Sequence, residues 1–326
     1  MNVNEVLETS PYLEVAVRHA YWKSAWLIER RSKKRPKAKV ERAKVNRFAE
    51  VTDALGELGA TSGRLLVVHS GYGALKPAGA SPAEIVDGLL GLVGPKGTLA
   101  VPAIPYYEGE PTGSAYMTAD VSDLVLEYDP ATTPVFTGAI PSVVMKRSDA
   151  IRSRHPLNTM AAVGPLAEAM MAGNLDGDAP LPCGPNSSWK FCIDHDALVL
   201  GLGVDMAHSL TMIHTAEDCH ADRWPQPGWY RKRRFLIIDG DDRREIVVRE
   251  RLPRWAMHYA ERTLHRDMLR EGIMQRREVC GVTLYALESR RLFDYLSSRN
   301  HRGYPFYMLP ATLPVVGRLT GAGSGR

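Results

Sequence analysis

His214 and Glu217 are the two side chains of this sequence best placed to do chemistry. They follow the apolar run 197–204, which has the pattern of a buried strand ending in glycines. A helix that begins near Ser209 or Thr211 would place the imidazole and the carboxylate on one face. A carboxylate that orients an imidazole and favours its protonated form suits a general base. The same spacing also occurs in surface pairs that only support a helix, and the sequence leaves both interpretations open.

Other uses of this histidine are conceivable. Ser70 follows a predicted strand and would complete a hydrolase triad with the pair. A nucleophile elbow, however, has glycines on both sides of the serine in the pattern G-x-S-x-G, and the residues around Ser70 do not match it. A metal site that adds His220 would need a break in the helix, because positions six apart point about 240° away from each other. We therefore expect no bound metal. A non-catalytic binding protein is a further alternative.

The composition of the chain indicates a globular α/β protein. It has 326 residues, of which 44% are hydrophobic, enough for one large domain or two smaller ones. No run of eighteen apolar residues occurs and the first residues lack the regions of a secretory signal, so we expect neither a transmembrane helix nor export. The four cysteines have no CxxC spacing and are typical of reduced thiols, which predicts a cytoplasmic location.

Charge is distributed unevenly along the chain. The formal net charge is +4, yet residues 30–44 alone contain nine Lys or Arg and one acid, Glu41. Residues 97–145 contain no Lys or Arg, and residues 155–222 contain a single one, Lys190. Acidic surfaces concentrate cationic ligands, so these windows favour a cationic small-molecule partner over nucleic acid. The basic segment is a solvated linker, a contact with an anionic surface or a patch for ligand phosphates.

A strand–helix–strand unit is the clearest predicted element. Residues 64–69 form a compact strand, Ser81 caps a helix that runs to about residue 92, and residues 98–102 form a second strand. This order predicts a parallel pair of strands in an α/β sheet. The first strand ends in the loop Ser70-Gly71-Tyr72-Gly73-Ala74-Leu75, and ligands of open α/β sheets bind at such strand ends.

The remaining pattern predicts further elements. Helices are expected at residues 1–28, 47–58, 138–146, 160–171, 252–271 and 289–298, and strands at 234–238, 245–248 and 278–285. The first two of these strands should form a hairpin, since a Gly-containing turn separates them. Residues 103–135 read as a long loop rich in tyrosine and acids, and loops of this length are usually functional or disordered.

Seven short motifs stand in a fixed order along the chain. They are Val67-Val68-His69-Ser70 with Leu75, Gly94-Pro95-x-Gly97-Thr98, Asp129-Pro130-x-x-x-Pro134 with Gly138, Arg152-Ser153-x-His155-Pro156, Gly184-x-x-Ser187, Gly201 with Val204, and Thr211-x-x-His214-x-x-Glu217. Together they resemble the aminoglycoside N(3)-acetyltransferase family, well over residues 48–222 and loosely beyond. The chain departs from the family at Gly71-Tyr72, where a second serine is usual.

The resemblance implies a fold and a reaction. The fold is a three-layer α/β/α sandwich with added helices, distinct from the GNAT acetyltransferases, and here it would carry the C-terminal β-hairpin. The reaction is transfer of acetyl from acetyl-CoA, the cosubstrate, to an amine of a cationic amino sugar, without a metal. His214 and Glu217 would lie at the chemistry. The residues that would line the CoA side are Ser70, Gly71, Tyr72, Gly73, Ala74, Leu75, Arg152, Ser153, His155 and Ser187.

Tyrosines and acids of the predicted loops would suit the hydroxyl-rich, cationic face of a sugar. We predict that Tyr106, Glu108, Asp129 and Asp205 bind the acceptor. The acceptor would be an aminoglycoside or, alternatively, an amino-sugar intermediate in the biosynthesis of an antibiotic or a surface polysaccharide.

A mechanism follows from the chemistry of amines, which are nucleophiles only when unprotonated. His214, oriented by Glu217, is the candidate base that removes the proton, after which the amine attacks the thioester directly. The Ser70 hydroxyl and the N–H groups of residues 70–75 are candidate donors to the developing oxyanion.

We divide the chain into three parts. Residues 1–46 would form a basic helical extension, residues 47–316 a single α/β domain, and residues 317–326 a Gly-rich flexible tail. We also consider a homodimer and a contact of residues 30–44 with an anionic surface.

Overall fold

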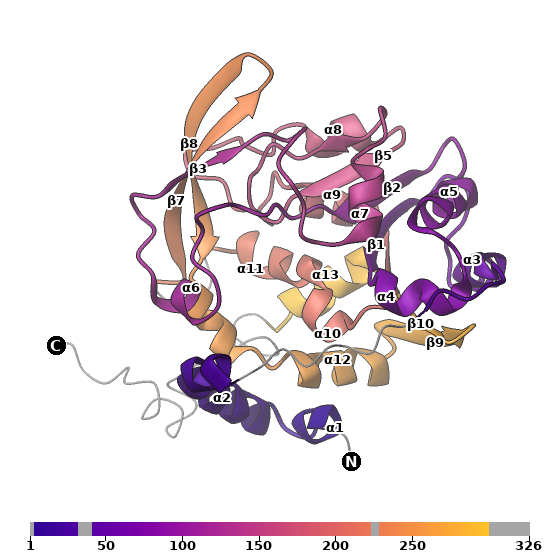
Figure 1. The fold of residues 1–326 in the computed structure, drawn as a ribbon, viewed down its shortest axis with the longest axis horizontal. Coiled ribbons are helices and arrows are strands. Elements are labelled where there is room, and N and C mark those ends of the chain that lie inside the picture. The colour runs from indigo at the N-terminus through magenta and orange to yellow at the C-terminus, as the bar shows by residue number, and fades with distance from the viewer. Residues whose placement is uncertain (1–2, 32–40, 223–227, 300–326) are drawn as a thin grey trace.

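The computed structural model describes residues 3–31, 41–222 and 228–299 of the chain. Within these residues a seven-stranded mixed sheet forms the centre, in the order β4-β5-β2-β1-β6-β10-β9 (Figure 1). The strands are β1 Leu65–Ser70, β2 Thr98–Pro102, β4 Ile151–Arg152, β5 Met160–Val163, β6 Leu198–Leu202, β9 Met274–Val279 and β10 Val282–Glu288. β1 pairs in parallel with β2 and β6, and the other neighbours are antiparallel.

Alternation along β1 explains why helices cover both faces of this sheet. Leu65 and Val67 join one buried cluster, whereas Leu66 and Val68 join another, because successive strand side chains point to opposite faces. The second cluster is completed by α3 Phe48–Glu57, α5 Pro82–Val93 and α7 Ala139–Val144, and the first by α8 Ala167–Met171, α9 Ser188–Asp194 and α13 Ser289–Ser297. The predicted three-layer sandwich is therefore confirmed.

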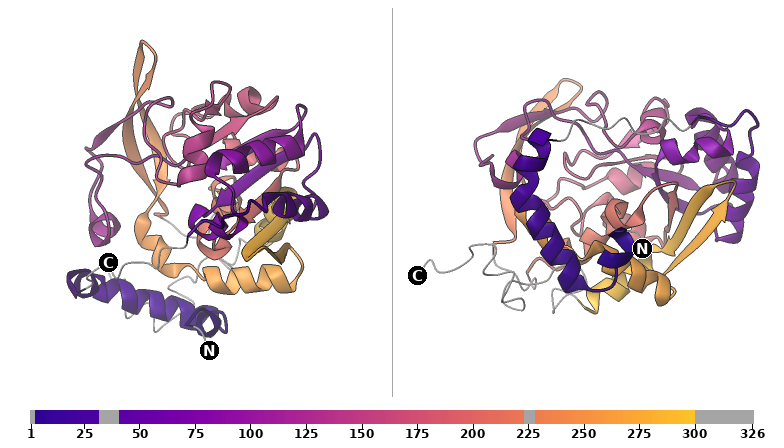
Figure 2. Two further views of the ribbon diagram at one scale, coloured as in Figure 1. Left: turned by 45° about the vertical axis from the view of Figure 1, so that its right-hand side comes forward. Right: turned by 60° about the horizontal axis from the view of Figure 1, so that its bottom comes forward.

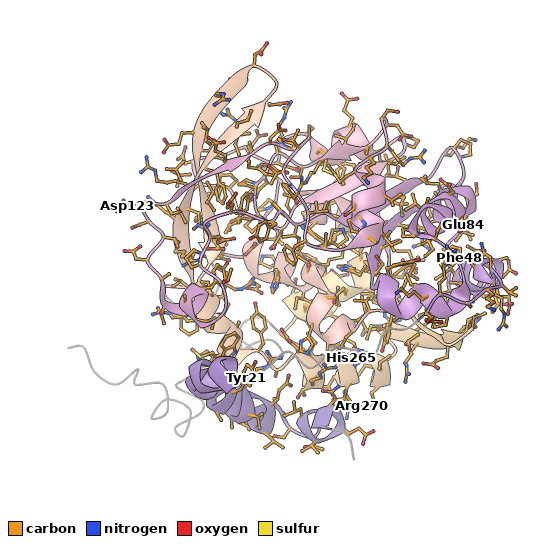
Figure 3. The ribbon with its side chains drawn as sticks, viewed as in Figure 1. Tyr21, Phe48, Glu84, Asp123, His265 and Arg270 are labelled. Atoms are coloured by element: carbon orange, nitrogen blue, oxygen red, sulfur yellow. The ribbon has the colours of Figure 1, made fainter. Side chains whose placement is uncertain are left out.

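The strand–helix–strand unit is confirmed in detail. The Ser81 hydroxyl accepts the N–H of Glu84, and the Glu84 carboxylate accepts the N–H of Ser81, so the predicted start of α5 is a complete capping box. Figure 3 shows Glu84 of α5 beside Phe48, the first residue of α3. These helices pack so closely that a Cβ on Gly88 would lie 2.9 Å from the Phe48 ring.

A smaller sheet of three described strands stands beside the sandwich. It consists of β3 Val125–Tyr128, β7 Tyr230–Asp239 and β8 Asp242–Arg251. β7 and β8 form the predicted hairpin, longer than expected, with Gly240 at φ +63° in its turn (Figure 1). The expected loop 103–135 is not structureless, because it contains α6 Ser114–Thr118 and β3. β3 was missed because it is a short edge strand that pairs only with distant residues of β7.

Three other predicted elements are wrong. Residues 160–171 contain β5 and then α8, separated by Gly164 at φ +129°, which packs against Gly97. Residues 278–285 are not one strand, because Cys280 and Gly281, at φ +52° and +73°, turn the chain between β9 and β10. Residues 252–271 form the 3-10 helix η3 Pro253–His258 and the helix α12 Glu261–Arg270 rather than one helix.

The N-terminal residues form α1 Val3–Leu7 and α2 Pro11–Arg31 instead of one helix. α2 lies along η3 and α12, as both views of Figure 2 show. The Glu14 side chain of α2 accepts the N–H groups of Arg262 and Thr263 at 2.8 and 3.0 Å. A carboxylate from the other end of the sequence thus caps α12 and explains why a new helix begins there.

Some predictions lie outside the described residues or remain untested. Residues 32–40, most of the basic segment, and the tail 317–326 are outside them. The division into three parts stays a prediction. Among the described residues, we find no helix with the length and hydropathy needed to cross a bilayer.

Candidate active site

Three short helical pieces carry the chain up to and past His214. After β6, the Asp205 carboxylate accepts the N–H of Ala207 and begins α10 Met206–Ser209. The 3-10 helix η2 Thr211–His214 and α11 Thr215–Asp218 follow. A helical segment begins at Thr211, one of the two predicted starts, after Leu210 with its non-helical backbone angles, but its first turn is a 3-10 helix.

His214 and Glu217 nevertheless meet, as their spacing predicted. His214 Nδ1 lies 2.6 Å from Glu217 Oε1. The Glu217 side chain has no exposed surface, and its other oxygen accepts the Nε1–H of Trp229 at 3.0 Å. The carboxylate is held from both sides, so it fixes the orientation of the imidazole.

Arg251, the last residue of β8, completes this cluster. Its Nη2 lies 3.2 Å from His214 Nε2, and its Nη1 lies 3.8 Å from Glu217 Oε2. The guanidinium lies over the Tyr259 ring, 5.4 Å from its centre, and that ring meets the imidazole edge to face. Because Nε2 faces a group that can only donate, we assign the neutral tautomer with its proton on Nδ1.

The surroundings favour the neutral imidazole. Burial lowers the pKa of His214, the positive charge of Arg251 lowers it further, and Glu217 offsets these effects only in part. As expected from the sequence, Glu217 favours the protonated form, but burial and the charge of Arg251, 37 residues away in the sequence, outweigh its effect. A neutral imidazole is the form that can accept a proton.

Asp218 is a second buried acid that the sequence analysis missed. It accepts hydrogen bonds from the Tyr230 hydroxyl at 2.9 Å and from the N–H of Cys183 at 3.1 Å. Burial, followed by the charge of Glu217, raises the pKa of Asp218 to about 7. The position of Asp218 directly after Glu217 in the sequence could have pointed to it.

A hollow of about 600 Å³ reaches this cluster. Its lining includes Tyr107, Glu110, Tyr116, Asp218, Glu250 and Arg251. The carboxylates suit a cationic ligand, although Arg233 pairs with both Glu110 and Glu250. Three of these acids, Glu110, Asp218 and Glu250, were not among the predicted site residues.

The predicted acceptor residues lie elsewhere. Tyr106, Glu108 and Asp129 line a neighbouring hollow of about 590 Å³, which shares Tyr107 with the first. The Asp129 carboxylate accepts bonds from residues 131 and 132 within its own turn. Asp205 is held by Arg262 at 2.5 Å. The structure therefore does not bring these side chains into the His214 cluster.

The loop after β1 lies at the crevice where ligands of α/β sheets bind. α5, which leads to β2, and α9, which leads to β6, cover opposite faces, so the carboxyl ends of β1 and β6 form a topological switch point. Here a Cβ on Gly71 would lie 2.5 Å from the carbonyl oxygen of Gly203. A side chain at position 71 would therefore require the two backbone segments to move apart. Ser70 ends β1, and Tyr72, Gly73, Ala74 and Leu75 form the short helix α4.

The other residues expected on the CoA side are buried and bonded within the chain. The Arg152 guanidinium donates to the carbonyl groups of Ala103 and Thr133, and the Ser187 hydroxyl caps α9. The Ser153 hydroxyl accepts the N–H of His155, and burial lowers the pKa of that histidine to about 4. Their structural contacts account for them, and a role toward CoA stays a prediction.

A serine triad and a metal site, the two alternative uses of His214, can be compared with the observed geometry around this residue. A serine triad would need Ser70 at His214 Nε2, the nitrogen that faces Arg251. Among the described residues, no three His, Cys, Asp or Glu side chains are grouped to hold a metal ion, and the His220 ring packs on Phe293.

The sequence from residue 67 to 299 matches the family model for aminoglycoside 3-N-acetyltransferases. The chain belongs to this family. Aminoglycoside N(3)-acetyltransferase IV of a Salmonella species is 31% identical over 178 residues, which span 52% of this chain and 58% of the relative. Aminoglycoside N(3)-acetyltransferase IX of Micromonospora chalcea is 28% identical over 257 residues, 74% of this chain and 88% of the relative.

Solved aminoglycoside acetyltransferases share the fold. AAC(3)-Xa superimposes with a TM-score of 0.65 at 22% identity, over 79% of this chain and 93% of that one. AAC-IIIb in a binary complex with CoASH gives 0.64 at 19% identity, over 78% and 95%. A histidine-to-alanine variant of AAC(3)-IVa in complex with a gentamicin gives 0.61 at 24% identity, over 83% and 93%. The sandwich is therefore that of the aminoglycoside 3-N-acetyltransferase family.

Proposed function

We propose that the protein transfers the acetyl group of acetyl-CoA to an amine of an aminoglycoside or a related cationic amino sugar. Family membership supports the reaction, and relatives with CoASH and with gentamicin bound support the two substrates. The observation that carries the proposal is the buried His214–Glu217 hydrogen bond beside a hollow with carboxylates in its lining.

His214 serves as the general base. The acceptor amine arrives as an ammonium, which is not nucleophilic, and transfers a proton to the lone pair of Nε2. Glu217 holds the Nδ1–H and stabilises the imidazolium that forms, while Trp229 keeps the carboxylate in place. The free amine attacks the thioester carbon, the carbon–sulfur bond breaks, and the CoA thiolate leaves and takes up the second proton that the attacking nitrogen loses.

Acetyl-CoA, the acetyl donor, binds at the carboxyl ends of β1 and β6. Gly71 and Gly203 let the two loops touch there, and backbone N–H groups of residues 70–75 can approach a carbonyl or phosphate oxygen closely. These N–H groups and the Ser70 hydroxyl are the proposed donors to the oxyanion of the attacked thioester. A cytoplasmic location and a homodimer stay predictions.

Thiol release from acetyl-CoA tests this function. The assay compares aminoglycosides such as gentamicin with simpler and nucleotide-linked amino sugars, with and without His214→Ala. Release with an aminoglycoside, lost in the variant, supports the proposal and a role in resistance. Release only with a simple amino sugar keeps the chemistry and moves the role to biosynthesis. Absence of release with every acceptor, while CoA binds, would reject acetyl transfer.

A further inference from the structure

Arg251 contacts Nε2 of His214, the nitrogen through which the proposed base has to accept a proton. Its Nη2 lies 3.2 Å from His214 Nε2, the lone pair to which an acceptor would have to give its proton. A guanidinium has no acceptor atom and stays charged, so this contact can only be a donation to the imidazole. The base cannot receive a proton through Nε2 while the guanidinium remains there.

The position of Arg251 allows it to leave. It is the terminal residue of β8, its side chain is 23% exposed, and it lines the same hollow as Glu110 and Glu250. The Tyr259 ring lies beneath the guanidinium, and the carboxylate of Glu217 lies 3.8 Å from it. A cation that enters from the hollow would thus meet Arg251 before it meets His214.

The groups around His214 differ in charge. Glu217 comes from α11, Arg251 from β8, and Tyr259 from the link between η3 and α12, while Glu261 at the start of α12 acts over a longer distance. The two carboxylates raise the pKa of His214, and Arg251 lowers it. Among these groups the guanidinium carries the positive charge, so its removal should raise the pKa of His214.

We propose that Arg251 is a positioning residue which holds resting His214 through Nε2 and is exchanged for the ammonium group of the acceptor. This inference rests on the proposed function. One cationic donor replaces another, so the buried carboxylate of Glu217 keeps a positive neighbour throughout. An uncharged hydroxyl of the acceptor offers no such replacement, which favours ammonium groups over hydroxyl groups at this point.

The proton balance of the exchange is simple. The acceptor ammonium gives one proton to Nε2, and the ring becomes an imidazolium that still donates its Nδ1–H to Glu217. When the acetylated product leaves, Arg251 returns and its charge favours loss of that proton to solvent. The resting enzyme then again has a neutral base.

The test uses the full chain and three variants. Arg251→Met removes the charge and keeps the aliphatic stem, and Arg251→Lys keeps the charge. Arg262→Met is the matched control, because Arg262 donates to His208 Nε2 in the same manner, at 2.8 Å, away from the hollow. The first readout is the titration of the His214 ring by NMR without substrates, with its signal assigned by loss in His214→Ala.

The expected result is a His214 titration that moves to higher pH in Arg251→Met and stays near its original position in the other two variants. The acid limb of the pH profile for kcat/KM should move in the same direction. An unchanged His214 titration in folded Arg251→Met, or an equal shift in Arg262→Met, would overturn the proposal. Since the titration needs no turnover, it separates failure of this inference from failure of the proposed acetyl transfer.

Discussion

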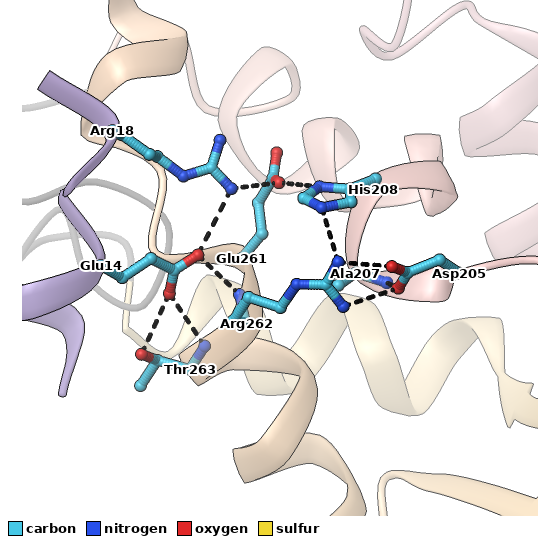
Figure 4. A network of polar contacts seen from close by, with 8 residues as sticks. All are labelled: Glu14, Arg18, Asp205, Ala207, His208, Glu261, Arg262 and Thr263. Carbon is cyan, nitrogen blue, oxygen red and sulfur yellow. Dashed lines mark hydrogen bonds and ion pairs between the residues drawn. The ribbon is translucent and has the colours of Figure 1, made fainter. Parts of the chain in front are cut away.

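Two histidines of this protein have the same kinds of partners in the same order. His208 Nδ1 faces Glu261 and its Nε2 lies 2.8 Å from Arg262, as Figure 4 shows. His214 has Glu217 on Nδ1 and Arg251 on Nε2. Pairwise contacts alone would therefore assign both histidines the same role.

The two clusters differ in burial and in what lies beside them. The His208 side chain is 48% exposed, whereas that of His214 is 14% exposed. Glu261 also binds Arg18, and Arg262 also binds Asp205, so the first cluster ties α2, α10 and α12 together (Figure 4). In the second cluster Arg251 borders a hollow. Burial and access, rather than residue types, therefore distinguish the His208 cluster, which we call the tether, from the proposed active site at His214.

Replacement of the carboxylates Glu217 and Glu261 should show the largest difference in kcat between the two clusters. Glu217→Gln leaves one acceptor oxygen for two donors, the His214 Nδ1–H and the Trp229 Nε1–H. We expect kcat to fall about a hundredfold, because the base loses its orientation. Glu261→Gln should keep nearly full kcat. Steady-state acetyl transfer measures both, and equal losses would contradict the distinction.

Buried Asp218 and exposed Asp205 should make contributions to the free energy of unfolding that change with pH in opposite directions. The pKa of Asp218 is raised to about 7, so the folded protein keeps a proton that the unfolded chain releases near pH 4. The stability from this group is therefore lost as pH rises from about 4 to 7. Asp218→Asn should gain stability relative to the parent over this window in urea unfolding.

Asp205 is the counterpart in the tether. Burial would raise its pKa, but hydrogen bonds and charge from Arg262 lower it overall. Its contribution to stability is therefore present above its unfolded pKa and is lost in acid. Asp205→Asn should cost more stability at neutral pH than in acid, and a trend of the same sign as that of Asp218→Asn would refute this account.

The smallest effect on activity is expected at Glu14. Its buried carboxylate caps α12 and binds Arg18, so Glu14→Gln places an amide donor against donors. We expect a loss of about 1–3 kcal/mol in unfolding free energy, with kcat per folded molecule unchanged. Urea unfolding and activity assays on one preparation measure both quantities. A large fall in kcat at full stability would show that the tether takes part in the chemistry.

Local interactions explain which features the sequence predicted. The capping box at Ser81 and the contact between His214 and Glu217 each involve residues three apart. Contacts between residues far apart in the sequence determine the features that the sequence did not predict. Glu14 starts α12 from 248 residues away. The four apolar residues of β5, buried in the sheet, carry no period that separates a strand from a helix.

The site shows the same division. Spacing predicted the contact between His214 and Glu217, whereas Trp229 and Arg251 reach the pair from the hairpin region. The predicted acceptor residues were chosen by composition, and composition does not report which hollow a loop side chain lines. The raised pKa of Asp218 depends on burial, which no local pattern of the sequence reveals.

Side-by-side rates of thiol release for His214→Ala and His208→Ala test the central claim most directly. With acetyl-CoA and an accepted amino sugar at saturation, we expect the first variant to lose about 10²- to 10⁴-fold in kcat. The second should retain nearly the parent rate once its fold is verified by thermal unfolding. Equal losses in the two variants, or a full rate in folded His214→Ala, would contradict the account.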